Sequence, residues 1–264
     1  MPATYAVTGV ASGIGAELAR ILKEQGHIVV GFDLQDTSRN VDHFISLDLN
    51  DPASVQQAAA AVSVKLDGLS NNAGLPPRDG LEQTILSVNF LGQRQFTHAM
   101  LGHMNTGGSI VNMASRAGHK WRENLAQVKR LGLLRTPDQL VDFIAAEGID
   151  PVRAYDLSKE AMILWTLAET EGLFPRDLRM NSISPGGVAT GILDDFAKAF
   201  GDRMSINVAR AGRPGQPEEV AEVAAFLLSP KSHWLKGEDI AIDGGMGAFN
   251  ATDAMGLADL QPSD

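Results

Sequence analysis

A tyrosine and a lysine four positions apart form the pattern in this chain that could perform acid–base chemistry. Tyr155 and Lys159 lie in the amphipathic segment YDLSKEAMILWTLAETEG, which predicts a helix with both side chains on one face. A tyrosine has an ordinary pKa near ~10 and exchanges protons poorly at neutral pH unless its anion is stabilised. The ammonium group of Lys159 would stabilise that anion. The pair therefore predicts proton transfer to or from an alcohol or carbonyl oxygen.

Ser115 is a third candidate for this site, because it follows the apolar segment GSIVNMAS, a predicted strand. Its hydroxyl could donate a hydrogen bond that orients a substrate oxygen. However, 39 residues separate Ser115 from Tyr155. Within this separation, RENLAQVKRLGLL predicts one helix. Thr136 and Pro137 would be the cap and first position of a second, with an apolar stripe of Leu140, Phe143 and Ile144.

The segment TGVASGIG, residues 8–15, joins the first predicted strand to a helix over residues 14–25. Gly9, Gly13 and Gly15 would let the backbone turn tightly and approach a pyrophosphate, which the helix N-terminus would bind through its free N–H groups. Three glycines alone are a weak signal. Here the strand before them and the helix after them favour a dinucleotide site.

The acidic residue expected of such a site is Asp33, which ends the second predicted strand, 18 positions after Gly15. A carboxylate there accepts hydrogen bonds from ribose hydroxyls and repels a 2′-phosphate. Leu34 and Gln35 follow it, so no basic residue is in place to bind that phosphate. The sequence therefore favours NAD over NADP. Asp48 is a second candidate, for the adenine amino group.

The order of predicted elements indicates an α/β protein. Short apolar segments alternate with helical ones, which is typical of a parallel sheet covered on both faces. We therefore predict one Rossmann-type, doubly wound, three-layer domain over residues 1–264. Its third strand would cover residues 43–49, and its later helices about 51–62, 81–104, 155–172 and 217–230. The tail after Gly247 is predicted to be irregular, either loose or packed on a neighbouring subunit.

Several motifs together resemble the short-chain dehydrogenase/reductase family over about residues 4–247. The glycine spacing is that of the family. So are the segments NNAG at residues 71–74, SVN with Asn89, IVNMAS with Ser115, YDLSK with Tyr155 and Lys159, SPGGVAT, and IDGG. The resemblance implies an NAD(H)-dependent oxidoreductase that interconverts a secondary alcohol and a ketone.

The resemblance also implies the site residues. The catalytic set would be Asn89, Ser115, Tyr155 and Lys159, with Lys159 also binding ribose hydroxyls and Asn89 holding a water that links the lysine to solvent. Val188 and Thr190 would contact the nicotinamide carboxamide. The complete set for NAD would be Gly9, Ser12, Gly13, Ile14, Gly15, Asp33, Asp48, Leu49, Asn72, Ala73, Gly74, Tyr155, Lys159, Pro185, Gly186, Val188 and Thr190.

Two segments would shape the substrate site. Residues about 190–212 correspond to the family's substrate lid, with Phe196, Phe200 and Met204 on one helical face, a pattern that fits ordinary packing equally well. Residues about 119–150 are an insert, because the family usually places its tyrosine about a dozen residues after the serine. This insert resembles that of bacterial 3α-hydroxysteroid dehydrogenases/carbonyl reductases, which implies a cyclic or apolar substrate such as a hydroxysteroid.

The insert also bears on subunit assembly. It flanks the helix of Tyr155, which family members commonly use in a four-helix interface between subunits. We therefore expect a homodimer joined elsewhere, with a tetramer as the alternative. The insert could also be a surface excursion without a role.

Composition excludes several other functions. The 264 residues include no cysteine, so disulfides, thiolate metal sites and cysteine nucleophiles are excluded. The net charge of −10 and the lack of a Lys/Arg cluster argue against nucleic acid, and no apolar run reaches membrane-spanning length. The six histidines lack metal-ligand spacing, so we expect no metal. No signal segment is evident, so a cytoplasmic location is expected.

Alternative functions on the same fold remain open at this point. One is a regulator that senses NAD without turnover, although such a protein would not need both Tyr155 and Lys159. Another is a sugar-type epimerase or dehydratase. Members of that family have a different glycine spacing and usually a longer C-terminal region. An enoyl reductase would have a wider gap between the tyrosine and the lysine.

Overall fold

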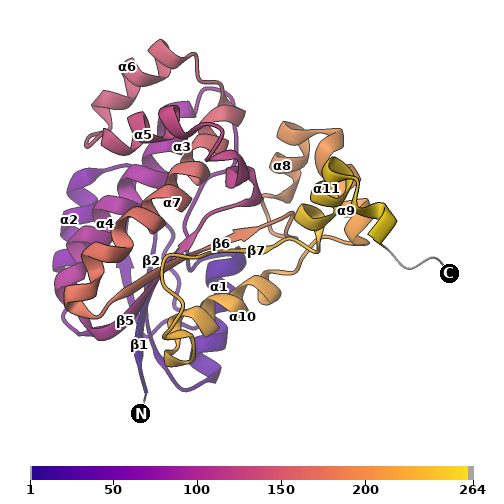
Figure 1. Ribbon diagram of the computed structural model, residues 1–264. Coiled ribbons are helices and arrows are strands. Elements are labelled where there is room, and N and C mark those ends of the chain that lie inside the picture. Colours follow the sequence, from indigo (N-terminus) through magenta and orange to yellow (C-terminus); the bar gives the residue numbers. More distant parts are fainter. Residues whose placement is uncertain (1, 261–264) are drawn as a thin grey trace.

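A seven-stranded parallel sheet forms the centre of the protein in this computed structural model (Figure 1). The structure describes residues 2–260, excluding the side chains of residues 197, 202–205 and 207. The strand order is β3-β2-β1-β4-β5-β6-β7. The first three strands are therefore added towards one edge of the sheet and the last four towards the other, and the order reverses between β1 and β4. The strands are β1 (Thr4–Thr8), β2 (Ile28–Asp33), β3 (His43–Ser46), β4 (Leu66–Asn71), β5 (Met104–Met113), β6 (Arg179–Pro185) and β7 (Asp239–Ile242).

Helices cover both faces of this sheet, which confirms the predicted three-layer fold. On one face α1 (Gly13–Glu24) packs against α10 (Pro217–Leu228). On the other lie α2 (Pro52–Ala60), α4 (Gln93–Met100) and the long α7 (Pro151–Leu173), as Figure 1 shows. Central strands such as β6 are buried along their whole length, as expected of a parallel sheet with two covered faces. No helix among residues 2–260 is long and apolar enough to cross a membrane.

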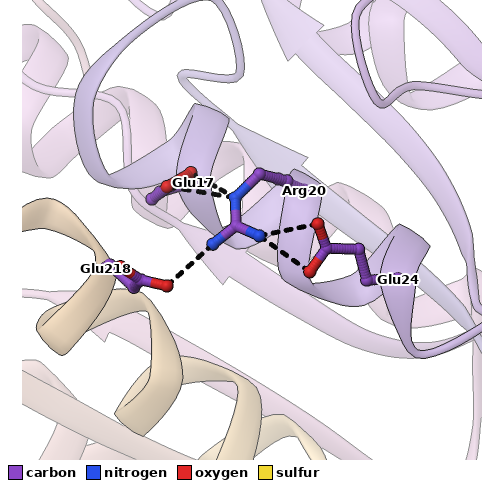
Figure 2. A network of polar contacts seen from close by, with 4 residues as sticks. All are labelled: Glu17, Arg20, Glu24 and Glu218. Atoms are coloured by element: carbon purple, nitrogen blue, oxygen red, sulfur yellow. Dashed lines mark hydrogen bonds and ion pairs between the residues drawn. The ribbon is translucent and has the colours of Figure 1, made fainter.

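An arginine on α1 links the two helices of the first face (Figure 2). Arg20 bonds Glu17 and Glu24 on its own helix at 2.8 and 2.7 Å, and Glu218 on α10 at 3.0 Å. These are partly exposed ion pairs, each of which adds little stability. The pair with Glu218 links α10 to α1, the helix that follows the glycine loop.

The long helix predicted over residues 81–104 is wrong in detail. The chain forms α3 (Glu82–Leu86), a π-helical turn over Ser87–Gly92 and then α4, and Met104 already belongs to β5. A Cβ on Gly92 would overlap the carbonyl oxygen of Leu49, so this turn packs directly on neighbouring backbone. π-helical turns often mark functional sites, and this one contains Asn89.

The insert folds into two helices, as predicted, with one error at a helix start. They are α5 (Leu125–Leu133) and α6 (Asp138–Glu147). Thr136 does not cap α6, which begins at Asp138; the Gln139 carboxamide oxygen instead accepts the N–H groups of Arg135 and Thr136. The following helix, α7, begins at Pro151 with Asp150 as its cap, earlier than predicted.

The prediction of an irregular tail is wrong for residues 248–260, while residues 261–264 lie outside the described residues. The third strand is shorter than predicted. Residues Met246–Met255 form helix α11, followed by a short 3₁₀ turn at Leu257–Leu260. Helix α11 packs against α9 (Asp202–Ala211), where Arg210 pairs with Asp253 at 2.6 Å and lies over the ring of Phe249. Strand β3 ends at Ser46 rather than at residue 49.

Candidate active site

A cavity of about 610 Å³ lies at the carboxyl ends of the strands. Its walls include Gly9 after β1, Asp33 at the end of β2, Asn72 after β4, Ser115 after β5 and Pro185 at the end of β6. This is the edge of a doubly wound sheet where ligands bind, beside the point at which the strand order reverses.

The cavity brings together nearly all of the predicted site residues. Gly15 and Asn89 are the two that do not line it. Those that do are Gly9, Ser12, Gly13, Ile14, Asp33, Asp48, Leu49, Asn72, Ala73, Gly74, Ser115, Tyr155, Lys159, Pro185, Gly186, Val188 and Thr190.

The glycine loop has the backbone geometry that a pyrophosphate needs. Gly9 and Gly13 have φ angles of 75° and 57°, which favour glycine. A Cβ on Gly15 would overlap the carbonyl oxygen of Gly9, so Gly15 lets the first turn of α1 pack against the loop. Ser12 makes no side-chain capping bond at the start of α1. The loop therefore brings bare backbone and a helix N-terminus to the cavity, which fits a dinucleotide.

Asp33 is fixed beside this loop. Its carboxylate accepts the N–H groups of Ala11 and Gln35, both at 3.0 Å. Basic side chains among the described residues of the cavity wall are Arg116, His119 and Lys159, which come from the segment after β5 and from α7. The Asp33 end of the cavity thus presents a carboxylate.

Tyr155 is buried beneath helix α8 (Leu193–Phe200). It lines the cavity together with Ser115, so these two predicted residues meet in one site despite their long separation in the sequence. Helix α8 brings Phe196 and Phe200 against the tyrosine, with ring centres 5.1 and 6.2 Å from that of Tyr155. Burial raises the pKa of Tyr155 above its ordinary value, an effect that the Ser115 side chain partly offsets.

Lys159 is also buried, and it faces the end of β5. Its Nζ donates to the Met113 carbonyl at 2.8 Å and lies 5.7 Å from the centre of the Tyr155 ring. Burial lowers the pKa of Lys159 to about 8. The raised pKa of Tyr155 runs against the expected stabilisation of its anion by Lys159, because burial raises this pKa and the charge of Asp156 adds to the effect.

Asn89 connects the segment after β4 to helix α7. Its Nδ2 donates to the Leu75 carbonyl at 3.0 Å and to the Ser158 hydroxyl at 3.3 Å, while its Oδ1 accepts from Leu75 N–H at 2.7 Å. A Cβ on Gly74 would lie 3.2 Å from Asn89 Oδ1 and 3.7 Å from Lys159 Nζ. The side chain is thus close to the lysine, but its amide is used for these bonds.

The segment after β6 lies against the glycine loop. Val188 pairs with Gly215 in an isolated parallel bridge, and Thr190 N–H donates to the Val188 carbonyl at 2.8 Å. A Cβ on Gly13 would lie 3.4 Å from the Thr190 methyl group. The predicted carboxamide-binding residues therefore lie beside the glycine loop in the cavity wall.

Sequence reasoning missed several cavity residues. Arg116 pairs with Asp243 at 2.9 Å, and its carbonyl contacts His119 Nδ1 at 2.8 Å. Asn250 comes from α11, in the tail that was predicted to be irregular. The position of Arg116 directly after Ser115 was the sequence signal that could have placed it in the cavity. The predicted lid residue Met204 has a side chain outside the described part of the structure.

Comparison with known proteins agrees with this fold. A family model described as "short chain dehydrogenase" matches residues 3–127, and one described as "Enoyl-(Acyl carrier protein) reductase" matches residues 140–247. Residues 128–139, inside the insert, lie outside both matches. Among the described residues, no group of three or more His, Cys, Asp or Glu side chains could hold a metal ion.

Individual relatives cover nearly the whole chain. A coniferyl-alcohol dehydrogenase of Pseudomonas sp. (strain HR199 / DSM 7063) is 38% identical over 91% of this chain and 94% of its own. A 3-alpha-hydroxysteroid dehydrogenase/carbonyl reductase of Comamonas testosteroni is 30% identical over 92% of this chain and 95% of its own. A solved structure of the 3-alpha-hydroxysteroid dehydrogenase from Pseudomonas sp. B-0831, complexed with NADH, is 28% identical. It has a TM-score of 0.79 and covers 94% of this chain and 98% of its own.

Fold, site and relatives together define an oxidoreductase built on a dinucleotide-binding domain. The chain belongs to the short-chain dehydrogenase family. Its class within that family is an alcohol dehydrogenase or ketone reductase that uses a nicotinamide dinucleotide.

Proposed function

We propose that the protein is an NAD(H)-dependent enzyme that interconverts a secondary alcohol and a ketone on a cyclic or apolar substrate. The observation that carries this proposal is that Tyr155, Ser115 and Lys159 line one cavity together with the glycine loop, with Lys159 Nζ 5.7 Å from the centre of the tyrosine ring. Relatives named as dehydrogenases favour an enzyme over a cofactor-sensing regulator and over an epimerase or dehydratase.

The residues present fit the proposed cofactor. The glycine loop and the first turn of α1 would hold the pyrophosphate, Asp33 the adenosine ribose, and Val188 with Thr190 the carboxamide. Lys159 would bind the second ribose. When bound, NAD supplies the hydride acceptor for an alcohol, and NADH the hydride donor for a ketone. The carboxylate of Asp33 supports the choice of NAD, because it would repel a 2′-phosphate.

The protein's own residues would handle the proton and the orientation. Tyr155 would accept the alcohol proton during oxidation and donate it during reduction. Ser115 would donate a hydrogen bond to the same substrate oxygen and hold it beside the tyrosine. Lys159 would relay the proton towards solvent. The Asn89 amide already bonds Leu75 and Ser158, and its Oδ1 keeps a second acceptor position that could bind a water in this relay.

The substrate side of the cavity is apolar and aromatic. The stacked rings of Phe196 and Phe200 cover the tyrosine. A flat hydrocarbon frame that displaced them would make similar apolar contacts with Tyr155. This supports a cyclic substrate such as a hydroxysteroid, as acted on by the relative from Comamonas testosteroni. An aromatic primary alcohol is a second candidate, because the 38% identical relative is a coniferyl-alcohol dehydrogenase.

We also propose that the subunits form a homodimer away from the exposed face of α4 and α7. The chain between α5 and α6 is bonded by Gln83 on α3 and by Arg94 and Gln95 on α4. The insert therefore lies beside the helices that a four-helix interface would need (Figure 1).

An NAD-linked oxidation screen with hydroxysteroids, cyclic alcohols and aryl alcohols tests the proposed function, with Tyr155→Phe as the diagnostic variant. We expect turnover to fall by about 10²–10⁴-fold, because only the proton-transfer hydroxyl is removed. The Kd for NADH, measured by fluorescence titration, should remain within about twofold, since the ring is kept. Undiminished turnover in Tyr155→Phe would show that another residue moves the proton.

A further inference from the structure

The insert begins inside the active site. A 3₁₀ turn over Arg116–Lys120 leads into it, and three residues of this turn, Arg116, Ala117 and His119, line the cavity. A Cβ on Gly118 would lie 2.8 Å from the carbonyl carbon of Lys159, so only glycine lets the turn pack on the backbone of α7 at the proposed catalytic lysine. The position of this cavity wall is therefore coupled to α7.

Glu160, the residue after Lys159, holds the start of α5. Its side chain is 1% exposed, although it is a carboxylate. It pairs with Arg153 at 2.6 Å and accepts a hydrogen bond from Asn124 Nδ2, also at 2.6 Å. Arg153 in turn donates to Gln127 of α5 at 2.9 Å. A charge is buried at a high free-energy cost unless it is paired and hydrogen-bonded, so this arrangement depends on α5 lying where it does.

A second buried charge holds the other end of α5. Arg94 of α4 is 5% exposed, and its guanidinium donates to the carbonyls of Gly132, at 2.7 Å, and of Leu134. The last turn of a helix leaves carbonyl oxygens unpaired, which is what this cation binds. Helix α5 is therefore fixed at its start by an anion and at its end by a cation, both supplied by the common part of the fold.

We propose that Glu160 is a positioning residue that, through Asn124 and Arg153, holds α5 and the turn Arg116–Lys120 as a fixed wall of the substrate cavity. In this role it determines how well bulky substrates bind and takes no part in proton transfer. The proposal rests on the proposed function, since it assumes that this cavity binds the alcohol. It makes the insert a specificity element rather than a gate or a surface excursion.

The size of the substrate separates this role from a catalytic one. A small alcohol needs only the region around Tyr155 and Ser115. A polycyclic or aryl-substituted alcohol extends to the wall formed by Ala117 and His119. Loosening α5 should therefore weaken binding of the bulky substrate alone, while the proton chemistry and the cofactor site stay intact.

The diagnostic variant is Glu160→Gln, which keeps the shape of the side chain and removes its charge. The matched control is Glu147→Gln, which removes the charge of the Arg130–Glu147 pair of 2.6 Å between α5 and α6, while the new amide oxygen can still accept the bond from Gln127. Three measurements are compared: amide hydrogen exchange at residues 117–134, the Kd for NADH, and kcat with KM for two alcohols. The alcohols are cyclohexanol and whichever of androsterone and coniferyl alcohol the wild type oxidises.

For Glu160→Gln we expect exchange at residues 117–128 to be about tenfold faster and KM for the bulky alcohol to rise about tenfold. Its kcat should change by less than about threefold, and KM for cyclohexanol and the Kd for NADH by less than about twofold. Glu147→Gln should keep wild-type kinetics. If Glu160→Gln does not fold, Asn124→Ala removes one of the same bonds and should give the same pattern.

Two results would overturn the proposal. Equal losses with both alcohols, together with weaker NADH binding, would mean that Glu160 acts through Lys159. Unchanged exchange in Glu160→Gln would mean that the insert does not depend on this residue. If the wild type oxidises no alcohol, the proposed function fails, and the exchange measurement still decides whether Glu160 fixes α5.

Discussion

Lys159 is a buried lysine, and its burial disfavours the charged form of the side chain. The ammonium group is buried, with the Met113 carbonyl as its described hydrogen-bond acceptor, and burial lowers its pKa to about 8. A group of this kind is typical of functional sites, because structural needs alone would favour an apolar side chain there.

The pH dependence of stability tests this interpretation of Lys159. Between about pH 8 and the unfolded-state pKa of about 10.4, the unfolded chain keeps a proton that the folded chain has lost. Relative to Lys159→Met, the wild type should therefore gain about 1.4 kcal/mol of unfolding free energy per pH unit in this window, and nothing below it. Urea unfolding of both proteins without cofactor, at pH 7 and pH 9.5, measures the gain, expected to be about 2 kcal/mol. A constant difference would mean that Lys159 titrates normally.

Asp33 is the residue on which cofactor choice depends. We expect kcat/KM to favour NAD over NADP in the wild type, because the carboxylate bonded by Ala11 and Gln35 would repel a 2′-phosphate. Asp33→Ala should reduce that preference by about tenfold or more, since it removes the charge. Asp48→Ala is the control, because it removes a second carboxylate of the cavity that is bonded within its own turn to Asn50. A wild type that uses both cofactors equally would contradict this assignment.

Helix α8 controls the environment of the tyrosine. Phe196 and Phe200 cover Tyr155, and Asp195 of the same helix pairs with Arg78, after β4, at 2.7 Å. The raised pKa of Tyr155 is due mainly to this burial, so removing part of the lid should lower it.

The chain has only two tyrosines, which makes this prediction directly measurable. In a Tyr5→Phe background, phenolate absorbance reports on Tyr155 alone. We expect its titration midpoint, without cofactor, to lie above the ordinary value, and Phe196→Ala to lower it by about one pH unit by admitting water. Phe226→Ala, on exposed α10 surface, should leave the midpoint unchanged. If Phe196→Ala has no effect, the lid does not cause the shift.

The sequence predicts the sheet and most of the cavity because those features leave local patterns. Glycines next to a helix, apolar strand runs, and the Tyr155–Lys159 spacing are all visible within short windows. Long-range pairings leave no such trace: Lys159 bonds a main-chain carbonyl 46 positions away. The tail helix α11 was missed for a related reason, because contacts with α9, through Arg210, hold it.

The assembly of whole molecules follows from the insert. We expect sedimentation to give twice the chain mass of 28.1 kDa, because the insert flanks the α4 and α7 surface that a tetramer would use. The cysteine-free sequence offers a sharper measurement. Leu167→Cys places one thiol on exposed α7 surface and should give no disulfide-linked dimer under mild oxidation. Efficient cross-linking through this residue would contradict the prediction.

Both edges of the central sheet are four-residue strands, β3 and β7, whereas the five strands between them have five to ten residues. A sheet edge presents unpaired N–H and C=O groups that can template pairing with another chain, and short edge strands limit that hazard. The longest strand, β5, which leads to Ser115, is enclosed between β4 and β6. The longest row of backbone hydrogen-bonding groups is thus kept away from the sheet edges in the folded protein.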